Sequence, residues 1–269
     1  MSEAVKIGVL GAAGRMGRML LRLASETPGI VLAGGSDRPG AADLDRDLGE
    51  LAGIGGLGLP LLDDAPPLFA AADVLVDFTQ PEASVRHAGL AAETGRALVI
   101  GTTGHDAQQL KAIATAAQRA PILQAANMSL GVNLLLVLVE QVAAKLDAAY
   151  DIEIVEMHHR MKVDAPSGTA LALGRAAAAG RGRPLEQLWV KSRDGITGKR
   201  ESGAIGFATL RGGDVVGDHS VIFAGPGERL ELRHQAQSRE LFAQGALRAA
   251  RWLAGRPPGR YGMRDVLGL

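Results

Sequence analysis

Short apolar runs alternate with helix-forming stretches through the first half of the chain. Four of these runs predict β-strands: 5–10, 30–34, 73–78 and 97–100. An apolar-periodic stretch at 19–24 predicts a helix, and a helix at 106–120 followed by a strand at 122–124 continues the alternation. The later runs are apolar almost throughout, as is typical of parallel strands covered on both faces. The pattern predicts an α/β fold with a Rossmann-like, doubly wound parallel sheet.

The regular alternation of predicted strands and helices ends after about residue 129. A long helix over 130–148 is predicted to lead into a strand over 151–159, and a second helix follows Ser167. Segments separated by glycine then predict antiparallel or mixed strands: 204–210, 215–224 and 229–235. Strands joined without helices indicate a second α+β domain with a mixed open sheet. A final helix over 238–254 has one apolar face and is expected to cover the first domain.

These changes divide the chain into two predicted domains. Residues 1–127 and 237–269 would form a dinucleotide-binding domain, and residues 128–236 a second domain that binds substrate. The stretch 125–129 is the expected hinge between them.

Composition narrows the class of protein. Acidic and basic residues are equal in number and the formal net charge is zero, which argues against nucleic-acid or membrane-surface partners. The absence of cysteine removes disulfides, thiolate catalysis and zinc–thiolate sites. The first six residues lack the basic-then-apolar pattern of a secretory leader, and no apolar helix is long enough to span a bilayer. A cytoplasmic protein is the expectation.

The glycine turn Gly11–Gly17 follows the first predicted strand and opens a helix. Its spacing is GxxGxxG rather than the commoner GxGxxG, so the strand–turn–helix context carries the prediction of a pyrophosphate site. Asp37 lies 26 positions after Gly11, near the separation of about 20 expected for an acid that binds the adenosine ribose. The neighbouring Arg38 could instead pair with a 2′-phosphate. Both NADH and NADPH therefore remain candidate cofactors.

A second candidate site lies at 156–169. His158, His159 and Lys162 stand just ahead of a helix whose N-cap is predicted to be Ser167. The first turn of such a helix attracts a carboxylate or phosphate, so proton donors beside it indicate a small acidic substrate. A metal site is not expected, because adjacent histidines on a strand project to opposite faces.

Taken together, the motifs resemble the 4-hydroxy-tetrahydrodipicolinate reductase (dihydrodipicolinate reductase) family. The similarity extends over essentially the whole chain and rests on these segments: Gly11–Gly17, Asp77–Glu82, Gly101–Gly104, Ala125–Asn127, His158–Thr169, Ile205–Ala208 and Gly227–Glu231. The histidine–lysine motif is highly specific to the family, whereas the glycine motif is shared widely. Met128 is a departure, because the family often has phenylalanine there.

The resemblance implies an NAD(P)H-dependent reductase of diaminopimelate and lysine biosynthesis, usually a homotetramer assembled through the sheets of the second domain. It implies His158 and Lys162 as the catalytic pair, and His159, Gly168 and Thr169 as substrate-binding residues. It also implies cofactor contacts at these positions: Gly11, Ala12, Ala13, Gly14, Arg15, Met16, Asp37, Arg38, Gly101, Thr102, Thr103, Ala125, Ala126, Asn127 and Met128.

The family's substrate is a cyclic imine dicarboxylate, which needs two anion sites. We expect the start of the helix at Gly168 and Thr169 to hold one carboxylate, and Lys162 with His159 to hold the other. His158, with an ordinary pKa near 6.5, is the expected proton donor after hydride transfer. Two alternatives stay open: another oxidoreductase of similar architecture, and a non-catalytic nucleotide sensor that binds NADH without turnover.

Overall fold

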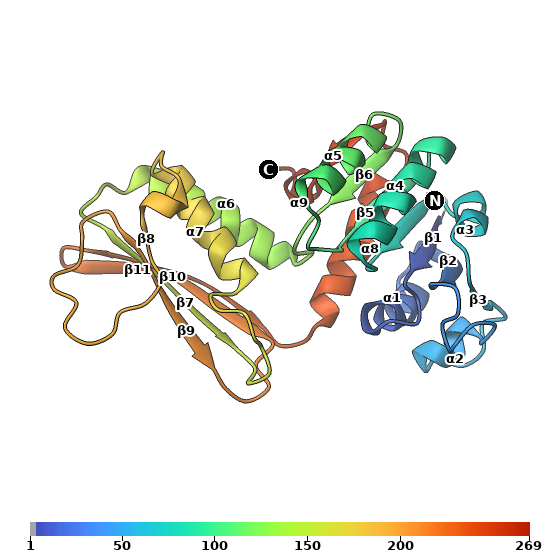
Figure 1. The fold of residues 1–269 in the computed structure, drawn as a ribbon, viewed down its shortest axis with the longest axis horizontal. Coiled ribbons are helices and arrows are strands. Elements are labelled where there is room, and N and C mark those ends of the chain that lie inside the picture. Colours follow the sequence, from blue (N-terminus) through green and yellow to red (C-terminus); the bar gives the residue numbers. More distant parts are fainter. Residues whose placement is uncertain (1–3) are drawn as a thin grey trace. The chain divides into compact units, whose positions relative to one another are not determined.

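The computed structural model describes residues 4–269. It forms two compact units, one made of the chain up to Ser129 together with Glu240–Leu269, and the other of Leu130–Arg239 (Figure 1). Residues 1–3, which belong to the segment inspected for a leader, lie outside the described part. We call the two parts the first unit and the second unit and describe each by itself.

The first unit is built on a seven-stranded sheet in which every neighbouring pair is parallel. The strand order is β12-β6-β5-β4-β1-β2-β3. The strands are β1 (Val5–Leu10), β2 (Ile30–Ser36), β3 (Leu61–Leu62), β4 (Val74–Asp77), β5 (Ala97–Ile100), β6 (Pro121–Gln124) and β12 (Gly259–Tyr261). The order reverses between β1 and β4, and ligands of doubly wound sheets bind beyond the carboxyl ends of strands at such a point.

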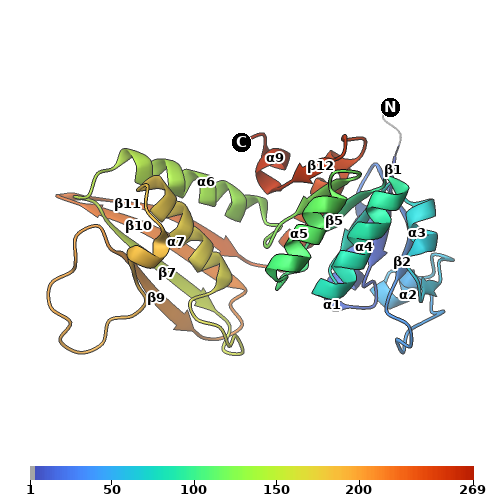
Figure 2. The same cartoon turned by 45° about the horizontal axis from the view of Figure 1, so that its top comes forward.

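Helices cover the sheet of the first unit. They are α1 (Arg15–Glu26), α2 (Leu48–Ala52), α3 (Pro66–Ala71), α4 (Pro81–Thr94), α5 (Ala107–Ala116), α8 (Glu240–Leu253) and α9 (Met263–Leu267). Helices α3, α4 and α5 lie side by side in Figure 2, and their buried residues share one core with strands β4 to β6. The C-terminal helix α8 packs against α1 and against β4 and β5.

Local sequence accounts for several element boundaries. Helix α5 begins with a capping box, in which Asp106 accepts from the backbone N–H of Gln109 and the Gln109 side chain accepts from Asp106. Helix α1 begins at Arg15, before the apolar stretch that predicted it, because Gly14 has extended backbone angles and is the N-cap of the helix. Strand β4 is buried at every position, and each fully buried Leu or Val contributes roughly 1.5–3 kcal/mol to folding.

The second unit contains a mixed five-stranded sheet in the order β11-β10-β7-β9-β8. Strand β10 is antiparallel to β11 and β7, whereas β7, β9 and β8 run parallel to one another. Its elements are α6 (Leu130–Lys145), β7 (Asp151–His158), α7 (Gly168–Gly180), the short 3₁₀ helix η1 (Leu185–Gln187), β8 (Trp189–Val190), β9 (Ile205–Arg211), β10 (Gly217–Gly225) and β11 (Glu228–Ala236). The predicted fold class, a Rossmann-like domain plus an α+β domain with a mixed sheet, is confirmed.

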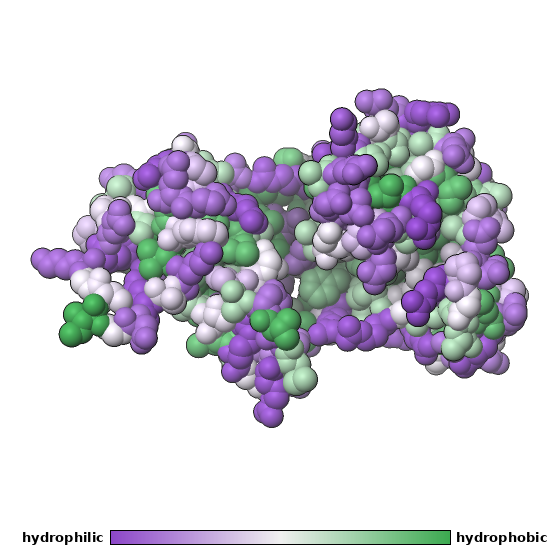
Figure 3. All heavy atoms as spheres, viewed as in Figure 1, coloured by the Kyte–Doolittle hydropathy of each residue, from purple (hydrophilic) through white to green (hydrophobic). Residues whose placement is uncertain are grey.

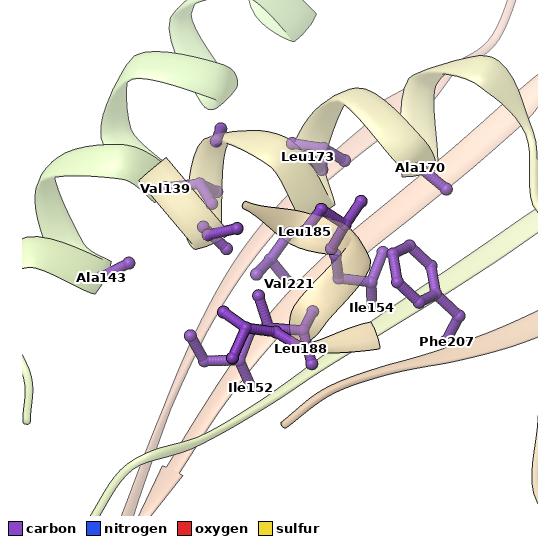
Figure 4. Packing of buried hydrophobic residues seen from close by; sticks show 14 of the residues in the cluster. Val139, Ala143, Ile152, Ile154, Ala170, Leu173, Leu185, Leu188, Phe207 and Val221 are labelled. Carbon is purple, nitrogen blue, oxygen red and sulfur yellow. The ribbon is translucent and has the colours of Figure 1, made fainter. Parts of the chain in front are cut away.

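Helices α6 and α7 pack on one face of this second sheet (Figure 4). The central strand β7 alternates strictly between partly exposed and buried positions. Its buried face carries Ile152 and Ile154, which lie in the core beneath α7, and then continues with Glu156 and His158. The two-residue alternation of β7 therefore buries the Glu156 carboxylate and the His158 imidazole on the same face as the core residues, at the C-terminal end of the strand.

The face seen in Figure 3 carries hydrophilic and hydrophobic residues side by side. The large apolar side chains that are most exposed are Met161 and Val163, on the loop after β7, and Ile196, on the loop between β8 and β9. Within residues 4–269, none of the helices combines the length and the apolar character that crossing a bilayer requires.

Candidate active site

The glycine turn of the first unit joins β1 to α1 at the point where the strand order reverses. Gly11 has φ +78°, and a Cβ there would lie 3.0 Å from Thr79 Cγ2 and 3.1 Å from the carbonyl oxygen of Phe78. The turn after β1 therefore lies directly against the loop after β4. The backbone N–H groups of Gly11 and Ala12 donate to the carbonyl oxygen of Ser36, at 2.8 and 3.0 Å, which fixes the turn to the end of β2.

Helix α1 approaches this turn too closely for a side chain at Gly17. A Cβ at that position would lie 2.2 Å from the carbonyl oxygen of Gly11 and 2.6 Å from the Cα of Ala12. The first turn of α1 carries no acidic side chain, and its N-cap is Gly14. A helix start without acids, reached through a tight glycine turn, fits the pyrophosphate of a dinucleotide.

Asp37, the predicted ribose-binding acid, is held in place by a hydrogen bond from the glycine turn. Its Oδ2 accepts from the backbone N–H of Ala13 at 3.1 Å, and its Oδ1 accepts from the N–H of Arg38 at 2.8 Å. The carboxylate is thereby held at the end of β2 beside the glycine turn, which is where an acid would bind an adenosine ribose. Arg38 itself is exposed.

A buried carboxylate links the two loops that follow β4 and β5. Asp77 is fully buried and accepts from the N–H and the hydroxyl of Thr79, at 2.8 and 2.6 Å. It also accepts from the hydroxyl of Thr102 at 3.1 Å and pairs with Nδ1 of His87 at 2.9 Å. Sequence analysis quoted Asp77 within a motif but gave it no role. Its role in the structure is to position the loop that contains Gly101, Thr102 and Thr103.

Several predicted cofactor residues share one pocket of about 250 Å³. The pocket is lined by Met16, Phe78, Gly101, Ala126, Asn127, Met128 and Phe242. The Phe78 ring lies under Gly101 so closely that a Cβ there would be 2.2 Å from it. Met128 is buried, and its carbonyl oxygen lies against Gly245 of α8. Sequence analysis missed Phe78 and Phe242, because an aromatic residue after a strand or on a helix is usually part of the core.

In the second unit, Glu156 is the centre of a buried polar cluster. Its Oε2 lies 2.5 Å from Nδ1 of His158, and its Oε1 accepts from the backbone N–H of Ser167 at 3.1 Å. The guanidinium of Arg211, on β9, donates to both carboxylate oxygens at 2.9 Å. Burial alone would raise the pKa of Glu156, but hydrogen bonds from Arg211 and His158 outweigh it and lower that pKa below 4.5. The carboxylate is therefore ionised near neutral pH.

Ser167 is the N-cap of α7, as predicted. Its hydroxyl accepts from the N–H of Ala170 at 3.1 Å and contacts Nε2 of His219 at 3.1 Å. The His219 ring stands edge-on to His158, with 5.1 Å between centroids. Burial, followed by the nearby His158, lowers the pKa of His219 to about 4. His219 is therefore neutral at physiological pH and does not compete with His158 as a proton donor.

The loop after β7 presents the remaining predicted residues. Lys162 Nζ pairs with Asp164 at 2.7 Å, and this contact lowers the pKa of Asp164. His159 Nε2 lies 3.3 Å from a guanidinium nitrogen of Arg239. Gly168 and Thr169 are the first two residues of α7, whose first turn has no acidic side chain. This part of the second unit thus combines cations with a helix start, an arrangement suited to a carboxylate-bearing ligand.

The pKa of His158 lies below the ordinary 6.5 on which the sequence argument relied. Burial is the largest cause; the carboxylate of Glu156 opposes it, and the charges of Lys162 and Arg211 lower the pKa further. The imidazole is therefore a stronger acid than an exposed histidine.

Sequence analysis gave no role to three polar residues of this cluster: Glu156, which begins the predicted segment 156–169, and Arg211 and His219, which lie outside it. The alternation of β7 could have placed Glu156 beside His158, since positions two apart share a face. Arg211 and His219 belong to strands far away in the sequence, and only sheet pairing brings them to β7, where His219 is paired with Glu156 and Arg211 with His158.

The Rossmann-like sheet, the glycine turn and the polar cluster together define a nicotinamide-dinucleotide oxidoreductase with a separate α+β unit. Comparison with known families gives the particular one. Residues 5–128 match the family model described as "Dihydrodipicolinate reductase, N-terminus", and residues 131–267 match "Dihydrodipicolinate reductase, C-terminus". The chain belongs to the dihydrodipicolinate reductase family.

Curated relatives support this assignment along the full length. The chain is 58% identical over 272 residues to 4-hydroxy-tetrahydrodipicolinate reductase 1 of Mesorhizobium japonicum, with 100% of both chains covered. It is 55% identical over 269 residues to 4-hydroxy-tetrahydrodipicolinate reductase of Beijerinckia indica, covering 100% of this chain and 99% of the relative. Among solved structures, dipicolinate-bound dihydrodipicolinate reductase from Paenisporosarcina sp. TG-14 has the same fold, with a TM-score of 0.75, 24% identity, and coverage of 97% and 99%.

Proposed function

We propose that this chain reduces 4-hydroxy-tetrahydrodipicolinate, or its dehydrated form, to tetrahydrodipicolinate with NADH or NADPH, as a step of diaminopimelate and lysine biosynthesis. The observation that carries the proposal is the buried carboxylate of Glu156, which joins His158 to the start of α7 in the second unit. A proton donor and an anion-binding helix start are thereby held together. The names of the full-length relatives supply the substrate.

The first unit would hold the cofactor. The glycine turn from Gly11 to Met16 and the start of α1 fit the pyrophosphate, and Asp37 with Arg38 lies where the ribose would bind. The stretches 101–103 and 125–128 would hold the nicotinamide end, next to the pocket floored by Phe78. When bound, the dinucleotide supplies the hydride. The chain's own task there is to orient the ring and keep the site apolar.

The second unit would hold the dicarboxylate. Its two negative charges call for two anion sites, and we assign one to the backbone of Gly168 and Thr169 at the start of α7. Lys162 and His159 would bind the other, with Lys162 exchanging its contact with Asp164 for the substrate. The related reductase from Paenisporosarcina sp. TG-14 is dipicolinate-bound, which is in keeping with an aromatic or cyclic dicarboxylate as ligand.

His158 would donate the proton that completes the reduction. The product of hydride addition is enamine-like and needs a proton at carbon, and positioned acid catalysis contributes roughly 10²–10⁴-fold. Lys162 would stabilise charge on the ring nitrogen or a carboxylate. Because His158 has a lowered pKa, we expect kcat/KM to fall as pH rises above that value, since the free enzyme then loses its proton.

The direct test is oxidation of NADH and NADPH in the presence of the freshly formed condensation product of pyruvate and aspartate semialdehyde. His158→Ala should lower kcat by roughly 10²-fold or more with little change in KM, because the proton moves only during reaction. Lys162→Met should abolish turnover while NADH affinity survives. Tight NADH binding without turnover by the wild type would instead indicate a nucleotide sensor, and unchanged kcat in His158→Ala would remove that residue from the acid role.

We also propose the unit assignments and assembly implied by the family. Residues 1–127 with 237–269 would serve as the dinucleotide-binding domain, and 128–236 as the substrate-binding and oligomerisation domain, in a cytoplasmic homotetramer. Leu210 and Leu230 are exposed leucines on the strands of the second sheet, and such apolar side chains are suited to burial between subunits. Light scattering coupled to size exclusion tests this, and a monomer at working concentration would contradict it.

A further inference from the structure

The carboxylate of Glu156 is buried in the second unit with only 1% of its surface exposed, an expensive environment for a charge unless it has a function or full compensation. Its partners come from different elements: His158 on the same strand, Arg211 on β9, and the backbone N–H of Ser167 at the start of α7. One group therefore contacts both the proposed proton donor and the proposed anion site.

We propose, on the basis of the proposed reductase function, that Glu156 is the positioning residue of the proton donor: it accepts Nδ1–H of His158, turns Nε2 toward the substrate, and stabilises the imidazolium. During reaction the Nε2–H bond breaks as a bond forms between that proton and the carbon of the reduced substrate. The imidazole returns to its neutral form with Nδ1–H still donated to Glu156, and solvent restores the proton at Nε2.

The geometry at Nδ1 supports this role. Glu156 Oε2 and His158 Nδ1 lie 2.5 Å apart, within hydrogen-bond distance. Because an ionised carboxylate can only accept, Nδ1 must carry a proton in both the neutral and the charged imidazole. Nε2 is then the nitrogen that gains and loses the catalytic proton.

The surroundings of Nε2 point the same way. A Cβ at position 217 would lie 3.0 Å from Nε2 of His158, so a side chain there would crowd this nitrogen, whereas Gly217 on β10 does not. The ring edge of the neutral His219 closes the neighbouring side. The imidazole is thus confined by Glu156 at one nitrogen and by β10 along its edge, which limits the directions in which Nε2 can deliver a proton.

The charges that face His158 show why Glu156 decides its acidity. Lys162 on the following loop and Arg211 on β9 both disfavour the imidazolium, and burial disfavours it further. Asp164 is paired with Lys162 rather than with His158. Glu156 is the group that favours the charged imidazole, and its effect exceeds that of either cation. Without Glu156, the pKa of His158 would be lower still, and less of the imidazole would be protonated at any given pH.

The test replaces Glu156 by glutamine, which keeps the size of the side chain and an oxygen for the N–H of Ser167 but removes the charge. For Glu156→Gln we expect the descending limb of kcat/KM against pH to move to lower pH by about one unit or more, with activity at pH 8 reduced roughly tenfold or further. The KM for NADH should stay unchanged, because the glycine turn belongs to the other unit.

The matched control is Glu153→Gln. Glu153 lies on the opposite face of β7 and is also paired with arginine side chains, Arg193 at 2.8 Å and Arg200 at 3.0 Å. Loss of this carboxylate, which does not contact His158, should leave the pH profile as in the wild type. The proposal would be overturned if the descending part of the kcat/KM–pH profile stayed in place in Glu156→Gln, or if it shifted equally in both variants.

A second measurement needs no turnover. Long-range ¹H–¹⁵N NMR of the six histidines reports which ring nitrogen is protonated, and His158→Asn assigns the resonance by its disappearance. We expect neutral wild-type His158 to carry its proton on Nδ1; a proton on Nε2 at high pH would refute the contact with Glu156. A wild type that shows this tautomer but no NADH oxidation would refute the proposed function while leaving the Glu156 contact standing.

Discussion

Gly17 is the residue where α1 most closely approaches the glycine turn, so we expect Gly17→Ala to weaken dinucleotide binding. The new Cβ would lie 2.2 Å from the carbonyl oxygen of Gly11, and real contacts of this kind are essentially never below 3.0 Å. The helix or the turn must therefore shift by about 0.8 Å. The same carbonyl accepts from the N–H of Gly14 at 3.1 Å, so the shift distorts the turn itself.

Two effects of opposite sign decide the outcome. Alanine favours a helix over glycine by about 1 kcal/mol, whereas inserting a methyl group into a close-packed contact costs typically 1–3 kcal/mol. The obstacle here is backbone, which cannot rotate away, so we place the cost at the upper end of that range. The packing cost exceeds the gain in helix propensity. If this net cost destabilises the conformation of the turn that binds NADH, the Kd for NADH rises by roughly tenfold or more.

The matched control is Gly89→Ala in the interior of α4, where a Cβ would meet nothing within 4 Å. This variant should gain roughly 0.5–1 kcal/mol of stability and bind NADH normally. Thermal unfolding and NADH titration by calorimetry measure both quantities. If Gly17→Ala were stabilised like Gly89→Ala and kept wild-type affinity, the close approach of α1 would not be what shapes the turn.

Two further predictions concern single side chains. Asp37→Ala should weaken NADH more than NADPH in the same titration; equal losses would mean that Asp37 acts only through its contact with the N–H of Ala13. His219 has a pKa of about 4 in the folded chain against 6.5 as its ordinary value, so its contribution to stability is fully present above pH 6.5 and is lost as pH falls through 4. Relative to His219→Gln, the wild type should lose about 3 kcal/mol of unfolding free energy between pH 7 and pH 4, measured by urea unfolding at each pH. Parallel curves for the two proteins would show that His219 is not the group being titrated.

The elements with strong apolar periodicity were predictable from the sequence. Strands β4 and β5 are buried on both faces, and uninterrupted apolar runs of this kind are recognised without knowledge of their neighbours. The N-cap at Ser167 was equally predictable, because capping is a contact between residues three apart. The boundaries differ by a few residues; for example, α6 ends at Lys145 instead of 148.

The candidate site was predictable only in part. His158, Lys162 and the start of α7 lie close together in the sequence, so local reasoning reached them. The acidity of His158 was not predictable, because it depends on burial and on Arg211, which pairing of β9 with β7 places beside it. Asp77 was likewise recognisable as a motif residue, but its partners His87 and Thr102 come from the following helix and from the loop after the neighbouring strand.

The sequence by itself determined the two kinds of sheet, the glycine turn with its helix, and the order in which histidine, lysine and capped helix follow one another, because each depends on periodicity or on contacts within a few residues. The tertiary structure alone decided which charges share a buried space: the pairing of β7 with β9 and β10 brought Arg211 and His219 to Glu156 and His158. Ionisation energies depend on distance and on exclusion of water, and neither is set until distant strands have packed together.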